Sequence, residues 1–345
     1  MTALIKQYMK WPAALLLAAF FIVACQQAPK ARVEVYNGFT MGTTFSVKWV
    51  AEKPETKAET GQKITQILAQ VNASMSTYIP DSELSLLNAS VSTDYQDLSA
   101  GLAEVLAMAQ QISERSGGAF DVTVGPLVNL WGFGPDGRVI KAPESAEIER
   151  QRRRIGFDKL ELDTESQRIR KLTPSLYIDL SAIAKGYGVD KVAELLEENG
   201  FSSYLVEIGG ELRARGVKPD GSSWKVAIES PVDGERAIQR VIEVDNIGIA
   251  TSGDYRNYFE ENGIRFSHTI DPHTGVPVSH KLASVTVLAP SCAEADATAT
   301  AISVLGPEKG YKHAVDHGVE ALFITKSGQG FKESMTPGFE KYLLK

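Results

Sequence analysis

Two oxygen-bearing side chains, Asp296 and Thr300, are the first candidates for chemistry in this sequence. They lie four residues apart in a segment that we expect to be helical, so both oxygens would point from one face. Oxygen ligands suit a hard cation such as Mg²⁺, which retains several waters and takes further oxygens from phosphates. An acid in the first helical turn also complements the helix dipole, and spacing alone favours that explanation.

Lys185-Gly186 and Gly209-Gly210 each follow an apolar, strand-like run. Glycine lets a backbone approach a bulky ligand closely, and a lysine neutralises a pyrophosphate. Neither segment forms a Rossmann or P-loop fingerprint, so ordinary turn glycines are the alternative explanation.

His268 is the third candidate, and Asp271-Pro272 follows it at a predicted turn. Its imidazole, with an unperturbed pKa of about 6.5, suits a general base at neutral pH. A lone histidine is more often structural, and we read the other histidines in that way. Cys292 fits a small buried residue, with a reactive thiol as the alternative.

Glycines and polar residues gather in short segments at the predicted ends of helices and strands. Loops in such places carry functional groups on a rigid scaffold, although each segment alone is a weak signal. The segments are 41–45, 76–88, 118–134, 179–186, 208–211, 267–272 and 294–300.

Apolar periodicity predicts an α+β fold of mixed, largely antiparallel sheets with packed helices. Helices are expected at 60–76, from Ser99 to the glycines at 117–118, and at 143–155, 181–199, 293–305 and 307–317. Strands are expected at 43–50, 159–172 as a hairpin, 204–208, 224–229, 238–244, 265–270, 284–288 and 320–325.

The first residues are typical of an export signal. Lys6 and Lys10 precede an uncharged run at 11–24, which is shorter than the roughly 20 residues that a membrane-spanning helix needs. The run ends in Ile22-Val23-Ala24-Cys25, which resembles a bacterial lipobox, with an ordinary signal peptide as the alternative. Acyl chains on Cys25 would hold a soluble domain at a bilayer surface.

These features predict a lipoprotein signal peptide at 1–24, a lipid-anchored tether at 25–32 and one domain at 33–345. We expect the domain on the periplasmic side of a bacterial membrane. The inner membrane is the expected location, but Gln26 is not the aspartate that often signals retention there, so the choice of membrane stays open.

The charge balance argues against a nucleic-acid partner. The full chain has a net charge of −7, and removal of the signal peptide takes away Lys6 and Lys10 but no acid, which gives −9. The basic residues between Arg150 and Arg154 fall in a probable helix and are explained by a solvated surface.

In order and spacing, the polar segments together resemble the ApbE family, the FAD:protein FMN transferases, from about Phe39 to the C-terminus. The set is specific even though each motif alone is weak, and it implies an ApbE-like, T-fold-like architecture. The motifs are Met-Gly-Thr-Thr, Gly-Ala-Phe-Asp-Val-Thr-Val-Gly-Pro-Leu, Trp-Gly-Phe-Gly, Lys-Gly-Tyr, Ile-Gly-Gly-Glu, Thr-Ser-Gly-Asp-Tyr, His-x-x-Asp-Pro-x-x-Gly and Ala-Asp-Ala-x-x-Thr.

The resemblance implies specific ligands for FAD and for Mg²⁺. The residues that would hold FAD are Met41, Tyr78, Ala119, Phe120, Asp121, Asp179, Lys185 and the backbone around Ile270. Mg²⁺ would be bound by the carbonyl of Ala182 with Asp296 and Thr300, which reverses the preference drawn from spacing alone. Some relatives carry a second aspartate where this chain has Ala299, so the full metal shell is left open.

The implied reaction is Mg²⁺-dependent transfer of FMN from FAD to a threonine or serine hydroxyl of a target protein, with release of AMP. Positioning and charge neutralisation, here by Mg²⁺ and Lys185, are the main demands of phosphoryl transfer. We assign the general base to His268, with Asp271 as its orienting partner or reserve.

Targets in the family are flavin-carrying subunits of redox complexes, such as sodium-pumping quinone reductases and Rnf-type complexes, and other extracytoplasmic flavoproteins. One rival function is an FAD pyrophosphatase that releases FMN and AMP, and the bulky Tyr78 argues against it by excluding water. Another is a non-enzymatic flavin-binding lipoprotein, against which the metal pair and His268 argue.

Overall fold

The computed structural model describes residues 31–51, 56–137, 139, 141–232, 237–253, 258–261, 264–328 and 330–344. The predicted signal peptide, the lipidation candidate Cys25 and most of the predicted tether lie outside these ranges and stay predictions. Within the described ranges, no helix has both the length and the apolar character needed to cross a bilayer.

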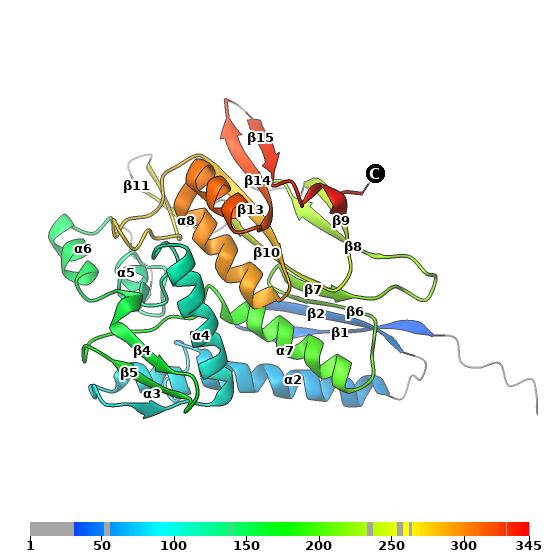
Figure 1. The fold of residues 1–345 in the computed structure, drawn as a ribbon, viewed down its shortest axis with the longest axis horizontal. Coiled ribbons are helices and arrows are strands. Elements are labelled where there is room, and N and C mark those ends of the chain that lie inside the picture. The colour runs from blue at the N-terminus through cyan, green and yellow to red at the C-terminus, as the bar shows by residue number, and fades with distance from the viewer. Residues whose placement is uncertain are drawn as a thin grey trace, which may run out of the picture.

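The fold is α+β, as predicted, and is built around an antiparallel sheet (Figure 1). In spatial order the sheet contains β1 (Arg32–Thr40), β2 (Thr43–Ala51), β6 (Tyr204–Ile208), β7 (Glu211–Arg215), β10 (Ile247–Gly253), β13 (Leu282–Ala289), β14 (Glu320–Ser327) and β15 (Gly330–Met335). Smaller sheets pair β8 (Trp224–Glu229) with β9 (Ile238–Val244), β11 (Tyr258–Glu261) with β12 (Ile264–Ser267), and β5 (Arg168–Lys171) with both β3 (Gln96–Asp97) and β4 (Leu160–Asp163).

The helices lie between and beside these strands. They are α2 (Thr56–Met75), α3 (Glu83–Ala89), α4 (Ala100–Arg115), α5 (Gly125–Leu130), α6 (Ser145–Arg152), α7 (Ala184–Glu198) and α8 (Cys292–Asp316), with one-turn 3₁₀ helices at Phe157–Lys159 and Glu340–Tyr342.

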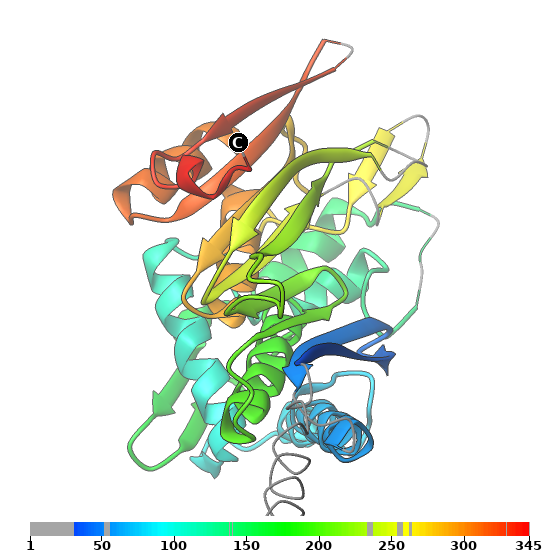
Figure 2. The same ribbon diagram turned by 90° about the vertical axis from the view of Figure 1, so that its right-hand side faces the viewer.

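The centre of the main sheet is buried on both faces, as strand β6 shows. Tyr204, Val206 and Ile208 pack with residues of α2 and α7, whereas Leu205, which points to the opposite face, packs with residues of β8 and β9. Figures 1 and 2 show these helices and the β8–β9 ribbon on different sides of the sheet. The sheet is therefore the middle layer of the molecule.

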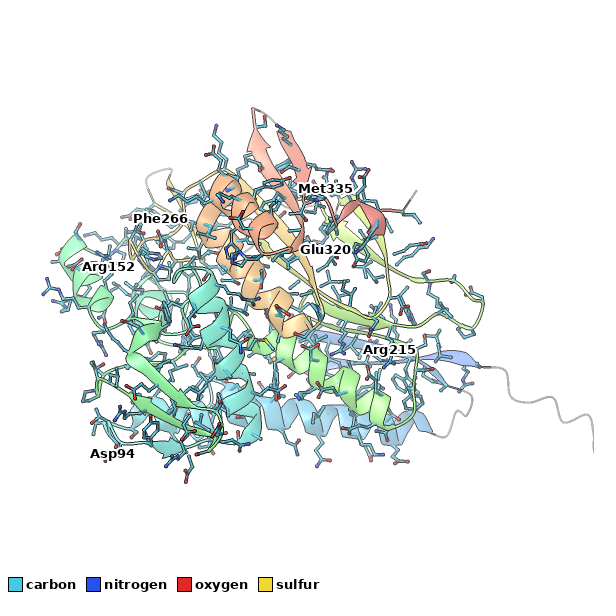
Figure 3. All side chains as sticks on the ribbon, viewed as in Figure 1. Asp94, Arg152, Arg215, Phe266, Glu320 and Met335 are labelled. Atoms are coloured by element: carbon cyan, nitrogen blue, oxygen red, sulfur yellow. The ribbon has the colours of Figure 1, made fainter. Side chains whose placement is uncertain are left out.

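Most predicted helices are confirmed. The hydroxyl of Ser99 accepts the N–H of Leu102 at 3.3 Å and caps α4, as the sequence indicates. The two helices predicted at 293–305 and 307–317 are the halves of α8, which is kinked at Gly306-Pro307. Helix α6 is shorter than predicted, and Arg152 pairs with Glu149 at the surface (Figure 3), in keeping with a solvated charge cluster.

Several strands of the main sheet were not predicted: β1, β7, β10 and β15. Strand β7 has only five residues, of which Leu212 and Ala214 are apolar, and two glycines interrupt the apolar pattern of β10, so both strands give a weak signal. Strand β1 begins at Arg32, the last residue of the predicted tether, and the strand predicted at 265–270 already ends at Ser267. Helices α3 and α5 were also missed because each is short.

Helix α8 lies directly on β10 because the strand carries glycine at the contact. A Cβ at Gly248 would lie 2.4 Å from the backbone nitrogen of Cys292, closer than real Cβ atoms approach. The first turn of α8 is thus held at a distance from the sheet that only glycine permits.

We predict that Gly248→Ala destabilises the protein by about 1–3 kcal/mol or more, because the new methyl group meets backbone rather than a flexible side chain. Urea unfolding of the purified protein measures this. Gly330→Ala is the matched control in another strand of the same sheet, since a Cβ there meets no atom within 4 Å. Equal stability of the two variants would show that the contact is not tight.

Candidate active site

The predicted site residues converge on a cavity of about 1160 Å³. The cavity is somewhat larger than the roughly 300–1,000 Å³ of typical small-molecule sites, so a dinucleotide is a reasonable occupant. Its walls include the first turn of α7, the face of α8 that carries Asp296 and Thr300, the β1–β2 turn and the loops after α2 and α4. The predicted residues among its lining are Met41, Tyr78, Ala119, Phe120, Asp121, Asp179, Ala182, Lys185, His268, Ile270, Asp296 and Thr300.

Lys185 stands between two carboxylates where α7 and α8 meet. Its Nζ is 3.0 Å from Oε1 of Glu211 and 3.5 Å from Oδ2 of Asp296. Burial opposes the charge on Lys185, but Asp296 and Glu211 outweigh burial, so the pKa of the ammonium is raised. The ammonium is therefore charged at neutral pH.

Glu211 belongs to this group, although no role was predicted for it. Burial raises the pKa of its carboxyl to about 7, with Lys185 opposing and Asp296 adding to the shift. Its Oε2 is buried without a hydrogen-bond partner among the described residues. The sequence signal that could have identified Glu211 is its position directly after the Gly209-Gly210 turn, at the start of a strand.

The donor set at this end of the cavity fits a hard cation. Asp296 is buried, and Ala182 and Thr300 line the cavity beside it. The unpartnered oxygen of Glu211 adds a further acceptor, and oxygen-only donors are those that Mg²⁺ takes. No group of three or more His, Cys, Asp or Glu side chains forms a metal cluster in the described part of the chain, so a cation here would rely on hydroxyl, carbonyl and ligand oxygens as well.

Hydrogen bonds to the backbone of Ile178 and Asp179 fix the position of Asp179. The side-chain amide of Asn88 donates to the carbonyl of Ile178 and accepts its N–H, both at 2.8 Å. The N–H of Asp179 then donates to the carbonyl of Val122 at 2.7 Å. The segments around Val122 and Asp179 therefore lie side by side in the cavity wall.

Asp121 organises its own loop. Its Oδ1 accepts the N–H and the hydroxyl of Thr123, and its Oδ2 accepts the N–H of Phe157 at 3.1 Å. Burial raises the pKa of Asp121 even though these hydrogen bonds oppose the shift. The geometry thus gives Asp121 a loop-shaping role, and its contact with FAD stays a prediction.

Met41 and Tyr78 occupy different parts of the lining. Met41 adopts a positive φ of 49° in the β1–β2 turn, and its Cε reaches Gly188 of α7, where an added Cβ would lie 2.9 Å away. Tyr78 is 66% exposed, and burial of its remainder, followed by the charge of Asp179, raises the pKa of its phenol.

His268 directly follows β12 and is half-buried beside an aromatic cluster. The ring of Phe133, from the Trp-Gly-Phe-Gly motif, meets its imidazole edge-on at 6.3 Å. Phe266 (Figure 3) stacks on Phe259 at 5.0 Å and on Trp131 at 5.4 Å. This cluster anchors the β11–β12 hairpin and so defines where His268 enters the cavity.

The carboxylate of Asp271, which was predicted as the partner of His268, accepts hydrogen bonds within its own turn. Its Oδ1 accepts the N–H of His273 at 2.9 Å, and its Oδ2 accepts the hydroxyl of Thr274 at 3.1 Å. Its side chain is not part of the described cavity lining. Its assignment as orienting partner stays a prediction, and this geometry favours a role in shaping the turn.

Comparison with known proteins gives consistent matches over most of the chain. The model of the ApbE family matches residues 41–323. The chain is 45% identical to a Haemophilus influenzae protein named FAD:protein FMN transferase, over 94% of each chain. It is similar to the solved structures of the flavin transferase ApbE from Vibrio cholerae (42% identity, TM-score 0.84, 91% of this chain and 100% of that one) and of the Pseudomonas stutzeri flavinyl transferase ApbE in its apo form (42%, 0.83, 90% and 97%).

The raised pKa of Glu211 predicts a pH-dependent cost to stability. Between its ordinary value of 4.5 and about 7 the folded protein holds a proton that the unfolded chain has released, so this residue's contribution to stability is lost as the pH rises through 7. In metal-free buffer, the unfolding free energy of the wild type should fall between pH 5 and pH 8 by about 2 kcal/mol more than that of Glu211→Gln. Urea titrations at the two pH values measure the difference, and equal losses would mean that Glu211 ionises normally.

Proposed function

The chain belongs to the ApbE family, and on that premise we infer that it is an FAD:protein FMN transferase. The observation that carries this proposal is the cluster of Lys185, Glu211 and Asp296 inside a dinucleotide-sized cavity that His268 also lines. With both acids ionised, the cluster has a net charge of −1. A diphosphate would add further negative charge in a region of low dielectric, which is unfavourable without another cation.

We propose Mg²⁺ as that cation, held by Asp296, Thr300 and the carbonyl of Ala182. When bound, it would neutralise charge on the diphosphate and on the departing AMP. Lys185 would then face phosphate oxygens with at least one of its N–H groups, because an ammonium has three donors and its two carboxylate neighbours occupy at most two.

The reaction itself exchanges one P–O bond for another. The hydroxyl oxygen of a threonine or serine in the acceptor protein attacks the FMN phosphorus, and the bond from that phosphorus to the bridging oxygen breaks. The products are a phosphodiester-linked FMN on the acceptor and free AMP. The hydroxyl proton is taken by His268 and passes from it to solvent.

Transfer must compete with attack by water, as in an FAD pyrophosphatase. Tyr78 is largely exposed, so its ring shields the cavity only when another surface covers it. We propose that the acceptor protein provides this surface, which limits hydrolysis while no acceptor is bound. A flavin carrier without activity is the other rival, and it gives no reason for a histidine that lines the same cavity as Lys185, Glu211 and Asp296.

We further propose that the enzyme is a lipoprotein, anchored through Cys25 on the periplasmic side of a bacterial membrane. Flavin-accepting subunits of redox complexes, such as sodium-pumping quinone reductases or Rnf-type complexes, are the proposed acceptors. Enzyme and acceptor would then face the same compartment.

The direct test is to incubate the purified protein with FAD, Mg²⁺ and a candidate acceptor domain, followed by mass spectrometry of the acceptor. We expect one FMN adduct on a threonine or serine, and equimolar AMP. Chelation of the metal with EDTA should abolish the adduct. Free FMN and AMP without an adduct would support the pyrophosphatase, and unchanged FAD would support the carrier.

We predict that His268→Ala still binds FAD but transfers FMN at least about a hundredfold more slowly, because general-base assistance contributes about 10²–10⁴ in rate. Stopped-time assays of adduct formation at saturating FAD measure this. His317→Ala, an exposed histidine near the end of α8, is the matched control and should keep wild-type activity. Near-normal transfer by His268→Ala would remove the assignment.

A further inference from the structure

The first turns of α7 and α8 are capped by each other. Asp190 of α7 accepts the N–H groups of Cys292 and Ala293, both at 2.9 Å, at the start of α8. In return, Asp296 of α8 accepts the N–H of Gly186, at 3.1 Å, in the first turn of α7. On α7, Asp190 lies four residues, or one turn, after Gly186. On α8, Asp296 lies four residues after Cys292.

This exchange satisfies backbone groups that neither helix can satisfy alone. The first N–H groups of a helix have no partner within the helix. Helix α7 has no side-chain cap, since its N-cap residue is Ile183. In α8, Ser291 caps only the N–H of Glu294, at 3.2 Å, and Asp190 takes the two before it.

The two helices approach closely enough only because residue 186 is glycine. A Cβ there would lie 2.4 Å from the carbonyl oxygen of Cys292. Cys292 is fully buried at this junction, and burial raises the pKa of its thiol, which supports the prediction of a small buried residue.

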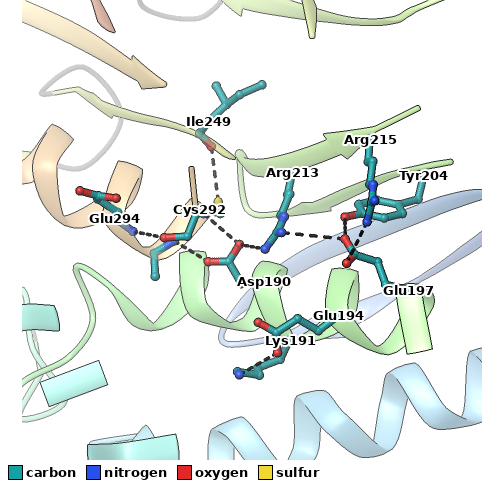
Figure 4. A network of polar contacts seen from close by, with 12 residues as sticks. Asp190, Lys191, Glu194, Glu197, Tyr204, Arg213, Arg215, Ile249, Cys292 and Glu294 are labelled. Carbon is teal, nitrogen blue, oxygen red and sulfur yellow. Dashed lines mark hydrogen bonds and ion pairs between the residues drawn. The ribbon is translucent and has the colours of Figure 1, made fainter. Parts of the chain in front are cut away.

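Asp190 also belongs to a network of charged residues that reaches the main sheet (Figure 4). It is 4% exposed, and its Oδ1 also accepts a hydrogen bond from Nη1 of Arg213, on β7, at 2.9 Å. Arg213 in turn lies near Glu197, which pairs with Arg215 at 2.9 Å. The orientation of the carboxylate is therefore fixed on both sides.

We propose that Asp190 is a positioning residue for the phosphate end of the site. It is absent from the described cavity lining, so it acts by holding the first turn of α8, one turn before Asp296. A tilt of that turn would displace Asp296 and Thr300 together and loosen Lys185. The proposal rests on the metal site of the proposed function.

The test compares Mn²⁺ binding, a spectroscopic substitute for Mg²⁺, in wild type and Asp190→Asn. An asparagine keeps the shape but turns an N–H donor toward backbone N–H groups or toward Arg213. With FAD present and no acceptor, the loss of the free Mn²⁺ EPR signal should give a dissociation constant at least about tenfold weaker for the variant, the range typical of residues that orient metal ligands. In transfer assays, kcat should fall while KM for the acceptor stays constant.

Thr336→Val controls for general loss of stability, because the buried Thr336 hydroxyl accepts the N–H of Ala321 at the far end of the sheet, at 2.9 Å. It should keep Mn²⁺ affinity within about twofold of wild type, as expected for a distant site. Equal Mn²⁺ affinity of Asp190→Asn and wild type would overturn the role of Asp190, whereas the absence of saturable Mn²⁺ binding by the wild type would overturn the metal site and the proposal together.

If Asp190→Asn does not fold, Arg213→Lys tests the same point more gently. It leaves the carboxylate in place but removes the planar guanidinium that orients it. We expect Mn²⁺ affinity below that of wild type, and wild-type affinity in this variant would overturn the proposal.

Discussion

The meeting of two helix N-termini is the constraint on which the site depends. Each terminus carries a partial positive charge and unpaired N–H groups. In α7 and in α8, a carboxylate from the other helix accepts hydrogen bonds from these N–H groups and balances the charge. That solution brings buried negative charge into the junction, so each carboxylate needs a cation. Arg213 serves Asp190 on the side of the sheet, and Lys185 serves Asp296 on the side of the cavity. The polar end of the cavity is thus a consequence of how the helices are capped.

Lys185 gives this junction an internal cation. Because its ammonium lies close to both Glu211 and Asp296, it partly balances the two carboxylates. The divalent cation of the proposed function would compete with that ammonium for Asp296. On that proposal, metal and dinucleotide would favour each other, since phosphate oxygens would offer Lys185 a new partner and would complete the ligand set of the metal.

The sequence predicted the fold class, most helices and the residues that surround the cavity, but it did so unevenly. Helices α2 and α4 were found because their apolar residues recur with a clear period. Strands β7 and β10 were missed because they pair with each other across a long stretch of chain, and because two glycines interrupt the apolar pattern of β10. Asp190 and Glu211 were not assigned because of the same long-range dependence. An acid on a helix, or after a glycine pair, acquires its role only from Cys292 or Lys185, which other elements bring beside it.

The same long-range dependence explains why the polar segments were informative only as a set. The cavity is lined by residues from Met41 to Val304, so each segment contributes only part of the lining and has no chemistry by itself. Met41 reaches the cavity from a hairpin turn, Asp179 from a loop held by Asn88, and His268 from a hairpin anchored by stacked aromatic rings. Each of these supports is specific to its own segment. Loss of any one would move a single group while the others stay in place, and a sequence can therefore keep the site only by keeping all of these segments together.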